Sequence, residues 1–253
     1  MWSARKVASS LTKPSRADPR VCCRTSDTAP LRVRWSTAEV GAHLVSLPSR
    51  YRRMFDAPQP FPASVAEQNR REIERIGERD PAVLADLLAV EVAAFLDACG
   101  ADGDRPVHYF TLRHTVGGIG GILLAELLMH GSDLAHDRNW PISREQAVAC
   151  LEGALPATVL SIDPAAARRA TGVYHVGLRG DGDWTYHVHD GAVTVQRGRP
   201  DRADLHISAD SVVFLRNAYG RLSAARAGLT GGILMWGRRP WLARRFGAMF
   251  VRL

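Results

Sequence analysis

The 253 residues, 46% hydrophobic and 23% charged, suffice for two modest folded domains. The net charge of +7 comes from arginines near both ends of the chain, and no nucleic-acid-binding motif accompanies them, so we expect no nucleic-acid partner. Because no apolar run approaches the roughly 20 residues of a membrane span, and residues 1–28 lack the apolar stretch of a secretory signal, we expect a cytoplasmic protein without a membrane span.

The first two-thirds of the chain has a helical pattern with short connections. Residues 1–33 are basic, weakly patterned and interrupted by prolines, which predicts a poorly structured N-terminal extension. From residue 34 to 164 the pattern favours an antiparallel bundle of helices. A capping box of Ser36 and Glu39 opens the clearest helix, in which Pro48 is a point where it can bend. Further helices are expected over residues 63–78, 80–99, 116–137 and 143–160, with 101–114 as a loop.

Residues 165–253 have a different character and predict a small α+β domain. Apolar and polar residues alternate at period two, and Asp190-Gly191 is a strong hairpin signal between two such runs. Strands are expected over residues 172–178, 184–189, 193–197, 204–208 and 229–236, and helices over 209–219 and 240–251. The predicted boundary between the two domains therefore falls near residue 165.

The most informative motif lies in the helix over residues 116–137. Glu126 and His130 are four residues apart, so their side chains leave the same helical face one turn apart. A carboxylate and an imidazole in an apolar setting are costly to bury unless they pair, hydrogen-bond or bind a metal. His43, on the earlier amphipathic helix, is the best third ligand, and such a set leaves a coordination position open. The alternative is a buried, metal-free Glu–His pair. Asp133 lies on the same helical face one turn further on, and we expect it to orient a metal ligand without binding the metal itself.

Other candidates are weaker. Arg238 and Arg239, beside Trp236 and Trp241, could form an anion-binding corner that contacts substrate, or merely a solvated helix start with two packing tryptophans. Six further histidines are expected to be surface, loop or structural residues, although His114 could line the cavity; they are His108, His114, His136, His187, His189 and His206.

Two segments resemble a known family. Residues 35–44 (WSTAEVGAHL) and 126–135 (ELLMHGSDLA) are similar to two signatures of the mycothiol-dependent maleylpyruvate isomerase family, and residues 203–232 resemble its second module. The resemblance covers roughly residues 35–253, whereas residues 1–33 lack the amphipathic first helix of that family. It implies a DinB-like four-helix bundle followed by a sterol-carrier-like α+β domain. It also implies a divalent metal, usually zinc, held by His43, Glu126 and His130.

The resemblance implies a metal- and mycothiol-dependent isomerase or S-transferase of actinobacterial type. A coordinated thiol loses its proton more readily than a free one and can attack a small electrophilic substrate. The expected partners are therefore a low-molecular-weight thiol and that electrophile. One rival is a sterol-carrier-like protein that binds apolar ligands and has a non-catalytic bundle. Another is a metal-binding or stress-response protein without turnover.

Overall fold

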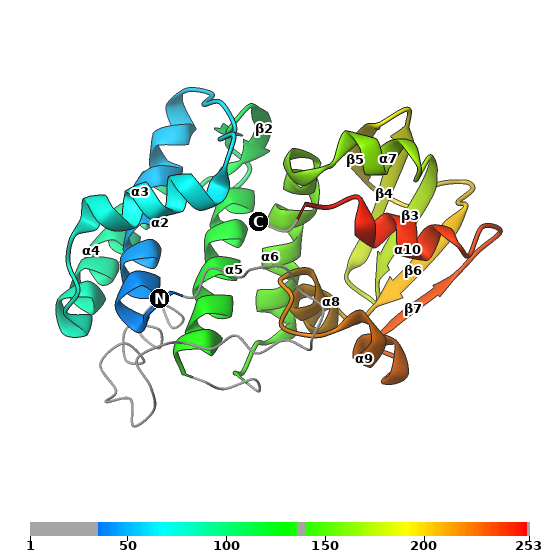
Figure 1. Cartoon of the computed structure of the whole chain (residues 1–253). Coiled ribbons are helices and arrows are strands. Elements are labelled where there is room, and N and C mark those ends of the chain that lie inside the picture. The colour runs from blue at the N-terminus through cyan, green and yellow to red at the C-terminus, as the bar shows by residue number, and fades with distance from the viewer. Residues whose placement is uncertain (1–34, 136–139, 252–253) are drawn as a thin grey trace. The chain divides into compact units, whose positions relative to one another are not determined.

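The computed structural model describes residues 35–135 and 140–251, which form two compact units dividing between Ile142 and Ser143 (Figure 1). The predicted fold class is confirmed, because a helical first unit is followed by an α+β second unit. The predicted extension over residues 1–33 and the predicted surface residue His136 lie outside the described residues. No helix of the described part is long and apolar enough to cross a membrane.

Helix α2 organises the first unit. It runs over Thr37–Asp56 and packs against α3 (Val65–Ile76), α4 (Pro81–Cys99) and α5 (Val116–Leu134). The predicted capping box is present, since Ser36 accepts from the Glu39 backbone N–H and the Glu39 carboxylate accepts from Ser36. Pro48 lies inside α2 without ending it. The core of this unit therefore lies around the helix that carries His43.

Residues 101–114, expected to be a loop, contain a short antiparallel hairpin. Strand β1 (Pro106–Tyr109) pairs with β2 (Leu112–Thr115), and the turn places Phe110 at a positive φ of 55°. The expectation was wrong because each strand has four residues, too few to show an alternating pattern. The turn also lacks the glycine or asparagine that usually marks a left-handed residue. Val107 and Phe110 are buried, so tertiary packing stabilises the hairpin.

The second unit is built on a five-stranded sheet with the order β5-β4-β3-β6-β7. Strands β3 and β6 are parallel, and the other neighbouring strands are antiparallel. The strands are β3 (Gly172–Leu178), β4 (Gly182–His189), β5 (Ala192–Arg197), β6 (Leu205–Ala209) and β7 (Ile233–Trp236). The helices are α6 (Arg144–Ala157), a 3-10 turn (Thr158–Ser161), α7 (Pro164–Arg168), α8 (Ser211–Ala218), α9 (Ala224–Leu229) and α10 (Leu242–Ala248).

Two features of the second unit differ from expectation. Helix α6 was assigned to the bundle over residues 34–164, but it groups with the second unit because it packs against α8 and β5. The last strand was expected to begin at Leu229, yet Leu229 ends α9 and β7 begins at Ile233. The six-residue helix α9 was missed because it is shorter than two turns and shows no helical period.

The sheet separates a core face from a polar face. Tyr174, Tyr186 and Leu205 lie on the core face and are fully buried. Alternation along the strands places His175 and His206 on the other face, side by side in the register of β3 and β6.

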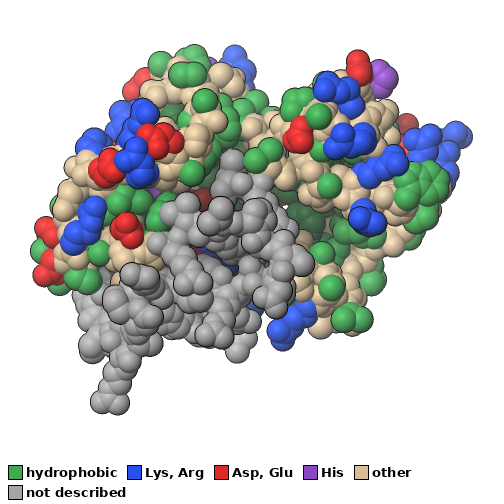
Figure 2. All heavy atoms as spheres, in the orientation of Figure 1, with side chains coloured by type: hydrophobic (Ala, Val, Ile, Leu, Met, Phe, Trp, Pro, Cys, Tyr) green, Lys and Arg blue, Asp and Glu red, His purple; other side chains and the backbone are tan. Residues whose placement is uncertain are grey.

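Both lysines of the chain precede residue 14, so arginine replaces lysine throughout the described part. The arginines are spread over both units (Figure 2).

Candidate metal centre

Helices α2 and α5 bring the three predicted ligand residues together. His43 lies on α2, and Glu126 and His130 lie one turn apart on α5. The Nε2 atoms of His43 and His130 are 3.8 and 3.5 Å from the same carboxylate oxygen, Oε2 of Glu126. Ligand atoms of the three residues all lie within 4.8 Å of one another. In the part of the chain that the structure describes, they form the only such group of histidine, cysteine and acidic side chains.

Burial sets the protonation of the cluster. His43 is 3% exposed, and its burial lowers the pKa of the imidazole to about 4, so the ring is neutral near pH 7. Burial alone would raise the pKa of Glu126, but the neighbouring imidazoles of His130 and His43 outweigh that effect and hold it below its usual range. A neutral imidazole and an ionised carboxylate are the forms that bind a divalent metal.

Asp133 lies behind His130. Its Oδ2 is 3.3 Å from Nδ1 of His130, while Nε2 of the same ring faces Glu126. Burial would lower the pKa of His130, but the neighbouring carboxylates of Asp133 and Glu126 outweigh it, so the pKa is raised. A carboxylate on the far nitrogen fixes the orientation of a metal-binding imidazole in many proteins. Asp133 therefore lies where it could orient the His130 ring, and its supporting role stays a prediction.

The donor set and its surroundings fit a divalent metal. Two imidazole nitrogens and one carboxylate oxygen are ordinary zinc ligands. Nδ1 of His43 is buried and has no hydrogen-bond partner among the described residues, so the ring is not fully satisfied by protein contacts alone. The indole of Trp35 covers the two imidazoles, with its ring centre 4.8 Å from that of His43 and 6.1 Å from that of His130. The predictions did not assign this role to Trp35.

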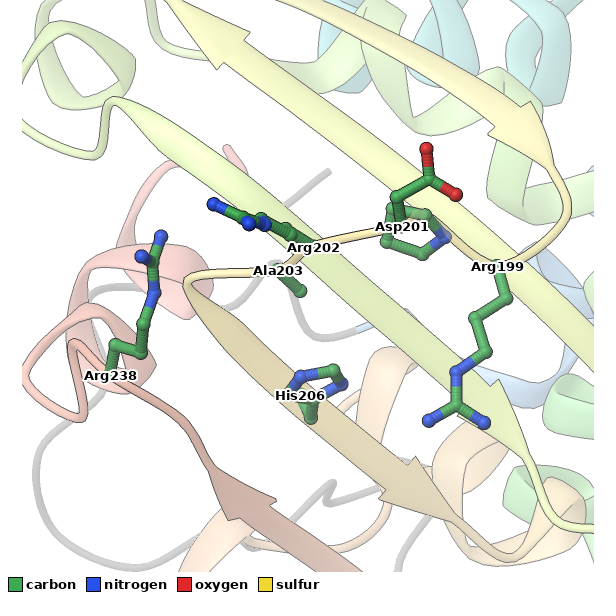
Figure 3. Close-up of a pocket in the computed structure, with 7 residues that line it drawn as sticks. Arg199, Asp201, Arg202, Ala203, His206 and Arg238 are labelled. Atoms are coloured by element: carbon green, nitrogen blue, oxygen red, sulfur yellow. The ribbon is translucent and has the colours of Figure 1, made fainter.

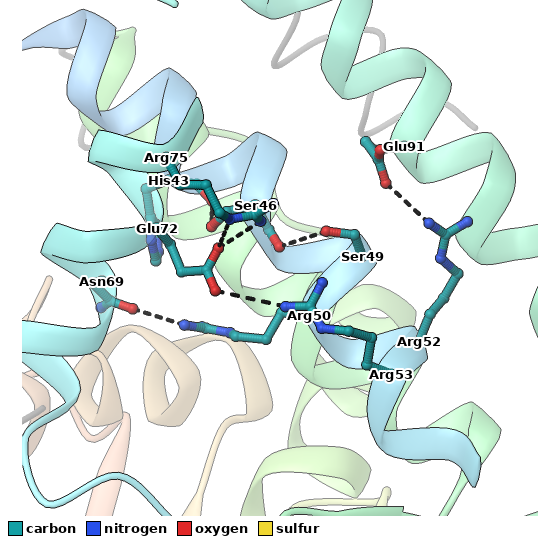
Figure 4. A network of polar contacts seen from close by, with 10 residues as sticks. All are labelled: His43, Ser46, Ser49, Arg50, Arg52, Arg53, Asn69, Glu72, Arg75 and Glu91. Carbon is teal, nitrogen blue, oxygen red and sulfur yellow. Dashed lines mark hydrogen bonds and ion pairs between the residues drawn. The ribbon is translucent and has the colours of Figure 1, made fainter. Parts of the chain in front are cut away.

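A buried cation near the cluster was also missed. Arg50 follows His43 by seven residues on α2 and is 7% exposed. Its Nη1 donates to Oδ1 of Asn69 on α3 at 2.9 Å (Figure 4), whereas its Nε has no hydrogen-bond partner within residues 35–135 and 140–251. The positive charge of Arg50 adds to the lowering of the His43 pKa. The seven-residue spacing between His43 and Arg50 places both on one face of α2, and this spacing was visible in the sequence.

The other sequence candidates lie elsewhere. His114 on β2 packs over Gly118 of α5, and its Nδ1 accepts from the Thr115 backbone N–H. Arg238 and Arg239 lie beside Asp204 in the second unit, where Nη2 of Arg238 is 3.0 Å and Nε of Arg239 is 3.7 Å from its Oδ1. Trp236 and Trp241 are about half exposed, and Trp236 packs against the ring of His206.

Comparisons with known proteins give one family model and several solved structures. Residues 27–135 match the model of the family described as the mycothiol maleylpyruvate isomerase N-terminal domain. No curated protein matches the chain. A solved structure of the mycothiol-dependent maleylpyruvate isomerase is similar at 13% identity and a TM-score of 0.48, covering 92% of this chain and 88% of that one.

Two further solved structures are similar. Sterol Carrier Protein 2 Like 2 from Aedes aegypti matches at 19% identity and a TM-score of 0.37, covering 43% of this chain and all of that one. A stereoselective inverting sec-alkylsulfatase from Pseudomonas sp. matches at 15% identity and a TM-score of 0.35, covering 77% of this chain and 33% of that one.

Proposed function

We propose that the chain is a divalent-metal- and mycothiol-dependent isomerase or S-transferase, because residues 27–135 match the model of the mycothiol maleylpyruvate isomerase N-terminal domain. The observation that supports this most is the buried cluster of His43, Glu126 and His130, whose ligand atoms lie within 4.8 Å of one another. We propose a cytoplasmic location as well, since free low-molecular-weight thiols persist in reducing compartments.

In this proposal His43, Glu126 and His130 hold the metal, and zinc suits two nitrogens and one oxygen. When bound, the metal supplies Lewis acidity that favours the thiolate form of a thiol cosubstrate. Asp133 fixes the orientation of the His130 ring, and Trp35 limits the access of water to the two imidazoles.

The thiolate sulfur would attack an electrophilic carbon of the substrate. In an isomerase, the sulfur adds to a conjugated double bond, the resulting single bond rotates, and elimination breaks the carbon–sulfur bond and returns the thiol. In a transferase, the carbon–sulfur bond stays, the proton that the thiol lost or one from water adds to the neighbouring carbon, and the product is a thioether. Both reactions need the same activated thiol, so the cluster alone does not choose between them.

Arg50 would recognise an acidic substrate. A buried guanidinium with one N–H unpaired among the described residues attracts a carboxylate more strongly than an exposed one, because water screens it less. We expect Arg50→Met to raise KM for an acidic electrophile more than it lowers kcat. Steady-state kinetics with an acidic substrate and its methyl ester would test this, since the ester should lose the dependence on Arg50.

The first test is metal content, measured by mass spectrometry on purified wild-type, His130→Ala and His108→Ala proteins. His108 lies on β1 outside the cluster and is the matched control. We expect near-stoichiometric zinc in the wild type and in the control, and loss of zinc in His130→Ala. A wild type that stays metal-free after incubation with zinc would overturn the proposal. The apolar-ligand carrier would then be the better hypothesis.

The second test addresses the thiol. The zinc-loaded protein is assayed for isomerisation of maleylpyruvate and for consumption of other electrophiles, with mycothiol or glutathione at equal concentration. We expect turnover with mycothiol and little with glutathione. Equal turnover with both thiols would contradict the mycothiol assignment while leaving a metal- and thiol-dependent reaction in place.

A further inference from the structure

A hydrogen-bonded row of side chains crosses the polar face of the second unit's sheet. Nε2 of His175 on β3 lies 2.5 Å from Oδ1 of Asp183 on β4. Nδ1 of the same ring lies 3.1 Å from Nδ1 of His206 on β6. The strand register aligns the row, since Gly177 pairs with Asp183 and His175 pairs with His206. Sequence reasoning treated His206 as structural, because only the pairing of β3 with β6 brings the two histidines together.

The row fixes which nitrogen of His206 is free. An ionised Asp183 is only an acceptor, so Nε2 of His175 carries a hydrogen. When both rings are neutral, Nδ1 of His175 is the acceptor in the 3.1 Å contact and Nδ1 of His206 is the donor. The remaining nitrogen of His206, Nε2, therefore presents a lone pair that can take up a proton. His206 is thus held in one tautomer and is ready to become a cation.

Two neighbours support this arrangement. Trp236 of β7 stacks on the His206 ring at a centroid distance of 5.5 Å and an interplanar angle of 13°, a geometry that stabilises an imidazolium. Gly177 leaves room for the row, because a Cβ there would lie 3.2 Å from both Oδ1 of Asp183 and Cε1 of His175. Larger residues at position 177 would crowd the Asp183–His175 contact.

His206 opens into a pocket of about 410 Å³ that is rich in arginine. Figure 3 shows Arg199, Arg202 and Arg238 around His206. Arg199 and Arg202 form no ion pair with any described residue, whereas Arg238 pairs with Asp204. Asp201 is the one acidic residue of the lining, so the lining carries a formal charge of +2 while His206 is neutral.

We propose that this pocket binds a phosphomonoester dianion, with Arg199, Arg202 and Arg238 as guanidinium donors and His206 as the group that shares a proton with the phosphate. A formal charge of +2 matches a dianion. One guanidinium group can donate two parallel hydrogen bonds to two phosphate oxygens. It is also weakly hydrated, so a phosphate can displace its water. This site lies wholly in the second unit and does not depend on the function proposed for the metal cluster.

Proton uptake should accompany binding. Burial is the main cause that lowers the pKa of His206, and the nearby Arg199 guanidinium lowers it further, so the free ring is mostly neutral near pH 7. A bound dianion favours the imidazolium, and binding should therefore weaken as pH rises. The charged and titratable groups that face His206 are His175 from β3, Arg199, Asp201 and Arg202 from the β5–β6 connection, and Arg238 from the segment after β7.

The test is isothermal titration calorimetry of the full chain with phenyl phosphate at about pH 7 and constant ionic strength. Each titration is run in two buffers of different ionisation enthalpy, so that proton uptake is measured with affinity. The variants are Arg199→Ala/Arg202→Ala, His206→Gln, and Arg226→Ala/Arg244→Ala. The last pair removes the same charge from exposed positions outside the pocket. Circular dichroism confirms that each variant is folded.

We expect the Arg199/Arg202 variant to bind phenyl phosphate about tenfold more weakly or worse, and the Arg226/Arg244 control to bind like the wild type. His206→Gln should lose the proton uptake. Absence of binding to the wild type, or equal weakening in both double variants, would overturn the proposal. Malonate, a dianion without phosphate geometry, should bind less tightly; equal affinity would overturn the assignment to phosphate.

Discussion

Asp133 lies beside His130 and is not one of the three proposed ligands, so its contribution can be measured separately from theirs. Asp133→Asn removes the negative charge beside the His130 ring and should leave the ring less firmly oriented. Loss of such a carboxylate in metalloproteins lowers metal affinity, so we expect zinc affinity to fall by about 10- to 100-fold. Competition with a chromophoric chelator measures this. Asp97→Asn, at the exposed end of α4, is the control and should leave the affinity unchanged.

Gly118 shows how closely α5 approaches the β1–β2 hairpin. A Cβ at this position would lie 1.8 Å from Cε1 of His114, so Gly118→Ala must displace a ring whose Nδ1 accepts from Thr115. We expect a loss of about 1–3 kcal/mol in the free energy of unfolding. Gly120→Ala, in the same helix with nothing within 4 Å, should instead gain roughly 0.5–1 kcal/mol. Urea unfolding measures the free energy of unfolding of both variants. An equal change in the two would contradict the steric argument.

The residues of the metal cluster were open to prediction because their signal is local. Glu126 and His130 lie within one helical turn, and the two family-like segments single out His43. Arg50 and Trp35 take part through tertiary packing, which one sequence does not show. The Asp183–His175–His206 row depends on a parallel pairing of strands separated by two others, so no local spacing could reveal it.

At the scale of elements, the start of α2 is defined by side-chain capping. Oγ of Ser36 accepts from the Glu39 N–H at 3.3 Å, and Oε2 of Glu39 accepts from the Ser36 N–H at 2.7 Å. Ser36→Ala removes one half of this box and should cost about 1 kcal/mol of stability. Ser36→Thr, which keeps the acceptor oxygen, should lose much less. Chemical unfolding monitored by circular dichroism compares them, and an equal loss in both would argue against capping.

Long helices with capping signals and the strands with alternating residues were predicted, whereas the β1–β2 hairpin and α9 were not. The bounds of α4 follow from Asp80 as N-cap and Gly100 at its end, both visible in the sequence. The β1–β2 hairpin and α9 are held by burial of Phe110 and Ala227, not by a pattern of their own. Helix α6 was predicted as a helix, but its partners were not, because its pattern does not say which core it joins.

At the scale of the whole molecule, each unit carries one proposed ligand site, so the two ligands should stabilise different parts of the chain. A ligand at about 100 times its Kd adds roughly 2.7 kcal/mol to the stability of the part that binds it. For a unit of this size that is a rise on the order of 10 °C in its unfolding temperature. We expect calorimetry to show two transitions, one raised only by zinc and the other only by phenyl phosphate.

The variants assign the two transitions. His130→Ala should abolish the effect of zinc and leave that of phenyl phosphate, because its side chain belongs to the cluster of α2 and α5. Arg199→Ala/Arg202→Ala should do the reverse, because both arginines line the pocket of the second unit. Equal shifts of one transition by both ligands would contradict separate sites. Such a result would also mean that the two compact units unfold as a single cooperative structure, since only then could either ligand stabilise both.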